Sequence, residues 1–318
     1  MNWNTYYRGT GTAAGDVRLP PPPPWRTFPR ASAAEVFHPP EGLVDAVNAA
    51  LCLRRPLLIT GPPGSGKSTV IEQVAAELGL GQVLRWHITS RSTLADALYR
   101  YDALGRIHAQ RLQHELARAR TEAVQVVDEV AEFLRLGPLG TALLPSSRPR
   151  ALLIDEIDKA DLDLPGDLLD VLERGEYRIA ELQREGRDIA EISGWDGEGG
   201  YRVEKGRVQC TEFPFIVMTS NEEQELPSPF LRRCVRYEMP PPTVELLGEV
   251  VRAHLGMDGE SEPAKTLIDS FVTRVGAGER VAVDQLLGTL HILRGVPEAN
   301  VGERKRLEKL LMKALGSA

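Results

Sequence analysis

The fold of this 318-residue chain is decided by one glycine-rich stretch, Gly61-Pro62-Pro63-Gly64-Ser65-Gly66-Lys67-Ser68. The stretch satisfies the pattern G-x-x-x-x-G-K-[ST], in which glycines let backbone amides turn inward and form a concave nest for phosphate oxygens. In this pattern Lys67 reaches the β- and γ-phosphates and the Ser68 hydroxyl holds Mg²⁺. We include the next residue, Thr69, in the predicted nucleotide-binding set. The sequence therefore predicts a nucleotide-phosphate site.

The residues on both sides of the turn have the pattern that such a site needs. Residues 56–60 form a short apolar run that predicts a buried strand. After the turn, apolar residues recur at helical spacing until Gly79, which predicts a helix over residues 70–78. The positive N-terminal end of that helix favours bound phosphate. A strand, a glycine-rich turn and a helix in this order are the context that the motif requires.

A second motif supplies acidic residues. Residues 151–154 predict a continuous apolar strand, which ends at Asp155 and Glu156. Parallel α/β sheets place their ligands at the carboxyl ends of strands. We expect Asp155 to hold Mg²⁺ through water and Glu156 to orient and deprotonate the attacking water. Taken together with the turn, the pair indicates ATP hydrolysis with ATP and Mg²⁺ as cofactors.

The remaining pattern predicts an α/β fold, a P-loop NTPase αβα sandwich with a parallel sheet, followed by a small all-α lid domain. Further strands are expected at residues 82–89, 215–219 and 235–239, with a helix around residues 168–172. After the triple proline 240–242 we expect four amphipathic helices, at residues 244–255, 263–275, 283–293 and 303–315. The predicted domains are a proline-rich extended arm (1–40), a nucleotide-binding core (41–240) with a helical insertion at about 90–147, and a helical lid (241–318). The arm holds eight of the 23 prolines, and it is either a strap on a surface or a disordered leader.

At the level of motifs the chain resembles AAA+ ATPases, and within them the MoxR group, which belongs to the helix-2-insert clade. The resemblance extends from about residue 41 to 255. It is carried by the turn and by five further segments, 41–48, 98–103, 152–161, 219–227 and 230–234. It implies an AAA+ core for residues 41–240 and places the clade's helix-2 insertion in the long segment between residues 90 and 145. The charged middle of that segment, residues 107–136, is expected to be helical, either as a partner contact or as a solvated hairpin.

The resemblance also assigns roles to residues beyond the two motifs. It makes Asn221 the sensor-1 residue, whose amide reaches the γ-phosphate and the lytic water, although a strand-capping asparagine is the alternative. It makes Arg232 or Arg233 an arginine finger for the neighbouring subunit's nucleotide, with Arg233 slightly preferred and the two not separable. MoxR-like chains usually carry a basic-proline stretch before the lid helix, which supplies the sensor-2 cation. That stretch has no proline here, so Arg280 is only the nearest candidate for the cation. Tyr177 and Trp195 are either substrate contacts or ordinary aromatic residues of a loop.

The resemblance implies a homo-oligomeric ring, expected to be a hexamer, that remodels a partner protein. The client or co-chaperone is expected to carry a von Willebrand factor A domain. An ATP-gated scaffold with little turnover is an alternative from a different class. A nucleic-acid-handling NTPase is a weaker one, because the formal net charge is −7 and no DNA-binding module is recognisable. No apolar run reaches the ~20 residues of a membrane span. The three cysteines are widely separated, which leads us to expect a cytoplasmic protein without membrane insertion.

Overall fold

A computed structural model describes residues 6–7, 9, 11, 18–28, 37–119, 129–197, 199–256, 262–279, 281–296 and 300–314. The chain forms two compact units. The first, here called the lid unit, comprises Met1–His38, Gly61–Lys67 and Met239–Ala318. The second, the sheet unit, comprises Pro39–Thr60 and Ser68–Glu238. The domain boundaries at residues 40 and 240 stay a prediction, and each unit is described below by itself.

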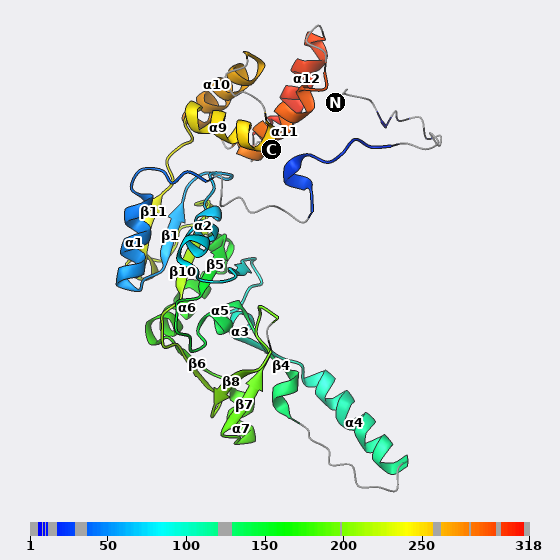
Figure 1. The fold of residues 1–318 in the computed structure, drawn as a ribbon, viewed down its shortest axis with the longest axis vertical. Helices are drawn as coiled ribbons and strands as arrows, with labels where there is room; N and C mark the ends of the chain where they lie inside the picture. The colour runs from blue at the N-terminus through cyan, green and yellow to red at the C-terminus, as the bar shows by residue number, and fades with distance from the viewer. Residues whose placement is uncertain are drawn as a thin grey trace. The chain divides into compact units, whose positions relative to one another are not determined.

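The sheet unit contains a five-stranded parallel sheet with the order β11–β1–β10–β5–β2 (Figure 1). In this register Thr60 lies beside Ser220, Met218 beside Ile154 and His87 beside Asp155. The carboxyl ends of all five strands therefore meet at one edge. The strands are β1 (Leu57–Thr60), β2 (Leu84–His87), β5 (Ala151–Asp155), β10 (Phe215–Ser220) and β11 (Val235–Glu238).

Both faces of this sheet are buried, which explains the continuous apolar runs in its strands. Leu58 and Ile154 belong to a core cluster that includes residues of α5 (Pro138–Ala142) and α6 (Leu164–Arg174). Their neighbours Ile59 and Leu153 are also buried. Helix α1 (Leu43–Leu53) contacts β1 and β11, and α2 (Thr69–Leu78) contacts β5. The predicted α/β fold with a parallel sheet and C-terminal helices is confirmed.

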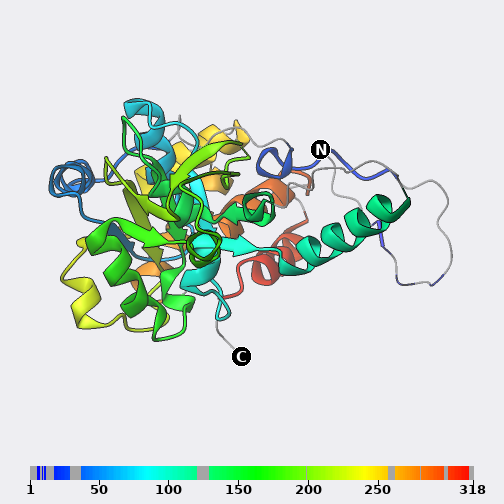
Figure 2. The same ribbon diagram turned by 90° about the horizontal axis from the view of Figure 1, so that it is seen from below.

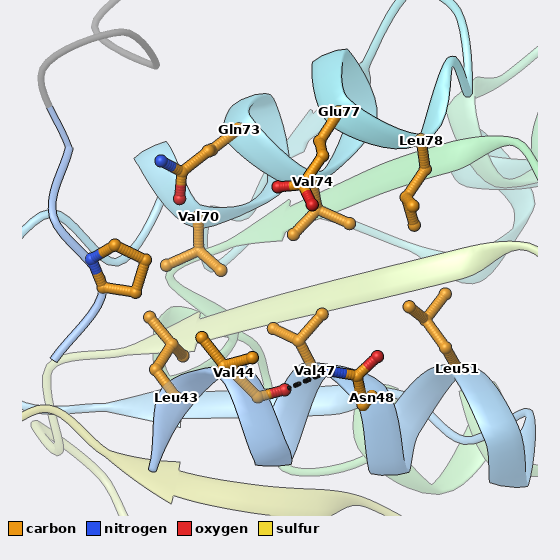
Figure 3. Close-up of a pocket in the computed structure, with 11 residues that line it drawn as sticks. Leu43, Val44, Val47, Asn48, Leu51, Val70, Gln73, Val74, Glu77 and Leu78 are labelled. Atoms are coloured by element: carbon orange, nitrogen blue, oxygen red, sulfur yellow. Dashed lines mark hydrogen bonds between the residues drawn. The ribbon is translucent and has the colours of Figure 1, made fainter. Parts of the chain in front are cut away.

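A shallow groove separates α1 from α2 (Figure 3). Val44, Val47 and Leu51 of α1 face Val70 and Val74 of α2 across it. Among the described residues that line the groove, Glu77 has the one titratable side chain. The groove is therefore a largely apolar seam between two helices.

The rest of the sheet unit differs from expectation. An antiparallel sheet of order β6–β9–β8–β7 occupies a region where no strand was expected. The predicted helix over residues 107–136 is wrong at its end, because Leu134–Leu136 is a strand, β4, that pairs antiparallel with β3. Helix α4 runs outward from β3 in both ribbon views (Figures 1 and 2), and residues 120–128 lie outside the described residues. The remaining elements are α3 (Leu94–Leu98), β3 (Tyr99–Tyr101), α4 (Ala103–Ala119), η3 (Val130–Phe133), η4 (Ile157–Lys159), β6 (Glu176–Arg178), α7 (Ala180–Glu185), β7 (Ile189–Ile192), β8 (Tyr201–Glu204), β9 (Arg207–Gln209) and α8 (Ser228–Leu231).

The lid unit is built around one apolar cluster of its helices. Trp25 of the proline-rich arm packs against this cluster, and its ring meets that of His291 edge-on with centroids 5.7 Å apart. Around Trp25 the arm therefore packs on a surface, as the first of the two alternatives predicted. The last helix starts two residues earlier than expected and ends at Leu311 instead of 315. The elements are η1 (Pro24–Arg26), α9 (Val244–Leu255), α10 (Glu262–Gly276), α11 (Val283–Leu293) and α12 (Val301–Leu311).

None of the helices in the described part of the chain combines the length and the apolar character that crossing a membrane requires.

Candidate nucleotide site

The phosphate-binding turn has the backbone that its glycines predict. Gly61, Gly64 and Gly66 all have positive φ, at 138°, 77° and 84°. A Cβ on Gly61 would lie 2.8 Å from the Cβ of Met239, so a side chain there would collide as well as strain the backbone. The Lys67 ammonium is buried and donates to the carbonyl oxygens of Gly61, at 2.9 Å, and Pro62, at 2.8 Å. These hydrogen bonds fix the Lys67 ammonium against the first residues of the turn.

The turn also packs on the helices of the lid unit. Pro62, Pro63 and Ser65 line a small apolar contact region, and the Ser65 hydroxyl is buried there without a hydrogen-bond partner among the described residues. A Cβ on Gly64 would lie 3.0 Å from the backbone nitrogen of Val283. The turn is therefore in direct contact with residues more than 200 positions away. The lid residues in this region are Pro242, Phe271, Val275, Val281 and Val283.

In the sheet unit, Ser68 and Asp155 are brought together as the two motifs predict. Helix α2 begins at Thr69, with Ser68 as its N-cap residue. The Ser68 hydroxyl donates to Asp155 Oδ1 at 2.9 Å. A hydroxyl and a carboxylate are the hard oxygen donors that Mg²⁺ prefers. The donor set therefore fits the predicted metal.

Asp155 and Glu156 are held by a residue that the sequence analysis missed. The Thr219 hydroxyl, at the end of β10, donates to Asp155 Oδ1 at 2.6 Å and accepts the Glu156 backbone N–H at 2.9 Å. Glu156 itself adopts the left-handed conformation, with φ 60° and ψ 50°. That conformation is unfavourable for a residue with a Cβ and persists only where the surroundings fix it. Thr219 supplies part of that fixation.

Three side-chain nitrogens lie close to the Glu156 carboxylate, and two of them donate hydrogen bonds to it. Lys159 Nζ donates to Oε2 at 2.8 Å, and Asn221 Nδ2 donates to Oε1 at 3.3 Å. His87 Nε2 lies 3.5 Å from Oε2, and its Nδ1 lies 3.9 Å from Asp155 Oδ2. The hydrogen bond to Glu156 is the largest cause that raises the pKa of the Lys159 ammonium. The resemblance predicted that the Asn221 amide reaches the γ-phosphate and the lytic water, whereas the contacts of Asn221, Lys159 and His87 with Glu156 come from the structure.

Asp158 explains why Asn221 lies where it does. The residue is 2% exposed, and its Oδ2 accepts the backbone N–H groups of Asn221 and Glu223, both at 3.0 Å. The loop after β10 is thereby tied to the turn after β5. Spacing alone could have suggested Asp158 and Lys159, which follow Glu156 by two and three residues, whereas His87 becomes a neighbour only through the strand order.

The predicted arginines lie apart from this cluster. Arg233 is exposed, pairs with Glu173 of α6 and donates to the Pro229 carbonyl at 3.0 Å. Arg232 is exposed, and its guanidinium makes no hydrogen bond or ion pair within the described residues. Neither guanidinium binds Glu156 or Asn221 in the described part of the protomer. Arg280, the sensor-2 candidate, lies outside the described residues.

Of the two aromatic candidates, Tyr177 is a core residue. It is 6% exposed, its hydroxyl donates to the Gly140 carbonyl at 3.2 Å, and burial raises its pKa well above the usual range. A substrate contact by Tyr177 is therefore wrong for this conformation, because its ring is covered by its own fold. Trp195 is 39% exposed, with the Arg135 guanidinium 6.0 Å from its ring centre. Trp195 remains accessible.

Comparison with known proteins gives a match to a family model. Residues 41–179, less than half of the chain, match the family model described as AAA ATPase domain. The match includes the turn, Asp155 and Glu156 but ends before Asn221 and the two arginines. No curated protein matches the chain. The family match, together with the parallel sheet and its flanking helices, supports an AAA+ P-loop ATPase as the class of this chain.

Proposed function

We propose that this protein is an AAA+ ATPase that binds ATP with Mg²⁺ and hydrolyses it to ADP and phosphate. The observation that carries the proposal is the cluster at the ends of β5 and β10. There a hydroxyl from the start of α2 binds Asp155, and the adjacent Glu156 lies within 3.3 Å of the Asn221 amide. A carboxylate base next to an amide donor is what positioning of an attacking water requires.

Each residue of the two motifs has a role in this proposal. The amides of Gly61–Lys67 and the Lys67 ammonium bind the phosphates, and Thr69 continues the amide row at the start of α2. Ser68 and Asp155 hold Mg²⁺, which when bound neutralises phosphate charge. Glu156 accepts a proton from the attacking water, and Asn221 orients that water.

The arginines support a proposal of assembly. We propose a homo-oligomeric ring, by resemblance a hexamer, in which one protomer supplies a guanidinium to its neighbour's nucleotide. Arg233 would have to leave Glu173 to do so, whereas the exposed Arg232 guanidinium has no partner within the described residues. Between the two, the free guanidinium is the better finger, which reverses the slight preference for Arg233 from sequence.

The narrower identity is proposed from motif resemblance alone. We assign the chain to the MoxR-like group, acting in the cytoplasm on a partner protein as a remodelling or maturation factor. A partner with a von Willebrand factor A domain is the expected client. Purified candidates of that class, added in increasing amounts, should change the rate of ATP hydrolysis. Equal rates with and without every candidate would contradict this client class.

The catalytic proposal is tested with Glu156→Gln and Lys67→Ala, measured for ATP binding and phosphate release. Glu156→Gln keeps the side chain's size and its hydrogen bonding to Asn221 but cannot accept a proton. We expect it to bind Mg²⁺-ATP and release phosphate at under about one hundredth of the parent rate. Lys67→Ala should weaken binding itself. Parent-like turnover by Glu156→Gln would remove Glu156 from catalysis.

One observation favours a second candidate function, an ATP-gated scaffold with little turnover. The Glu156 carboxylate is paired with the Lys159 ammonium at 2.8 Å, so its Oε2 is already engaged by a cation of the same protomer. In a scaffold, ATP binding alone would drive assembly. Light scattering with ATP measures assembly of the parent protein and of Glu156→Gln, and phosphate release measures hydrolysis. Only a scaffold would assemble with ATP while hydrolysis by the parent protein stays negligible.

A further inference from the structure

We propose that Thr219 and Asp158 together form a clamp that positions Glu156 against Asn221. This inference rests on the proposed ATPase function and concerns residues that neither motif includes. Thr219 lies at the end of β10 and binds groups at the end of β5. Asp158 lies just after β5 and binds groups after β10. The two ties run in opposite directions across the same pair of strand ends.

The Thr219 tie uses both functions of one hydroxyl. The hydroxyl donates to Asp155 Oδ1 and accepts from the Glu156 N–H, so it bridges the predicted metal-binding carboxylate and the backbone of the predicted base. Thr219 is 1% exposed, which removes water as a substitute partner. The same Asp155 oxygen also accepts from Ser68. The hydroxyl thus fixes the carboxylate's rotation and the left-handed peptide of Glu156 at once.

The Asp158 tie fixes the other partner of the pair. Its Oδ2 accepts two backbone N–H groups from the loop that carries Asn221, at 3.0 Å each. Bonds from two amides to one carboxylate are charge-assisted and therefore stronger than neutral ones. They set the backbone of Asn221 itself, so its amide can meet Glu156 Oε1 without relying on a long flexible side chain.

Together the ties set a distance that neither strand pairing nor the side chains would hold alone. The β5–β10 pairing ends at Ile154 and Met218, before Glu156 and Asn221. Beyond that point β10 remains paired with β1 and β5 with β2, so the Thr219 and Asp158 bonds are what join the end of β5 to the end of β10. Both are positioning residues, because they act through Glu156 and Asn221 rather than on nucleotide.

The test compares Thr219→Val with Thr219→Ser in steady-state ATP hydrolysis by the full-length protein. Valine keeps the shape and removes the hydroxyl, whereas serine keeps the hydroxyl and removes a methyl group. We expect Thr219→Val to lower kcat by at least about ten-fold with KM for ATP changed less than about three-fold, and Thr219→Ser to retain more than about a third of parental kcat. A reversed order, with valine active and serine impaired, would overturn the proposal.

Two further measurements keep the outcome decisive. If Thr219→Val does not fold, Thr219→Ala against Thr219→Ser isolates the hydroxyl in the same way, and equal kcat values for these two would overturn the proposal. Asp158→Asn keeps one carbonyl oxygen as acceptor and should lose less kcat than Asp158→Leu, which has none. Absent hydrolysis by the parent protein would refute the proposed ATPase, whereas an active parent with unchanged Thr219→Val refutes only the clamp.

Discussion

Replacing Lys159 by methionine should increase the basal rate of ATP hydrolysis. Lys159 Nζ donates to Glu156 Oε2 at 2.8 Å, so the ammonium stabilises the charged carboxylate. When Glu156 takes a proton from water, it loses that charge and with it the attraction to Lys159. An interaction that is stronger in the ground state than in the transition state slows the chemical step. Methionine keeps the apolar stem and removes only the charge.

The size of the effect follows from the exposure of the pair. The side chains of Lys159 and Glu156 are 39% and 24% exposed, so solvent screens much of the attraction. Partly exposed ion pairs of this kind contribute about 0.5–1 kcal/mol. If the whole of that energy is lost on protonation, kcat rises by about two- to five-fold. This is the upper limit, because the proton is only partly transferred in the transition state.

The assay is phosphate release at saturating Mg²⁺-ATP, with Lys159→Arg as the matched control that keeps the positive charge. We expect Lys159→Met to exceed the parent and Lys159→Arg to remain near it. Melting temperatures establish that both variants are folded. A Lys159→Met enzyme slower than both parent and Lys159→Arg would show that the ammonium assists catalysis, and the reasoning above would be refuted.

Two further predictions concern the arginines and the thiols. Arg232→Ala should lower kcat of the assembled protein by at least about a hundred-fold, as loss of an arginine finger does, and Arg233→Ala by less than ten-fold; the reverse order in the same phosphate-release assay would assign the finger to Arg233. In a thiol titration of the native protein, Cys52, which is exposed, should react first, and Cys234 last, because burial raises its pKa to about 12; equal rates for the two, resolved by mass spectrometry, would contradict the burial of Cys234.

The parts of the fold that could be predicted from sequence are those with a local cause. Gly79 ends α2 in the left-handed conformation, which only its lack of a side chain makes easy. Helices α9 and α11 begin and end at the predicted residues, because in each the helical spacing of apolar residues starts and stops at those positions. The strands β7 and β8 have four residues each, and in β7 the apolar Ile189 lies on the exposed face while the small Ala190 is buried. Strands this short are stabilised mainly by pairing and packing with neighbouring strands, so their own residues are not enough to predict them.

The same distinction holds for the site. Ser68, Asp155 and Glu156 could be predicted because each belongs to a motif whose spacing is local in the chain. Thr219 and His87 could not, since their roles depend on which strands flank β5. Asn221 was predicted by resemblance, and the structure adds the physical reason for its position, the two amide bonds to Asp158.

The packing of Pro62 and Pro63 on Phe271 and Val283 has a practical consequence for protein production. The motifs alone would suggest that a fragment ending near residue 240 is a self-sufficient catalytic piece. Such a truncation would remove the apolar residues that pack on the two prolines, and it would remove the backbone of Val283 that lies against Gly64. Expression trials that aim for a competent nucleotide binder should therefore retain the sequence through α11 at least.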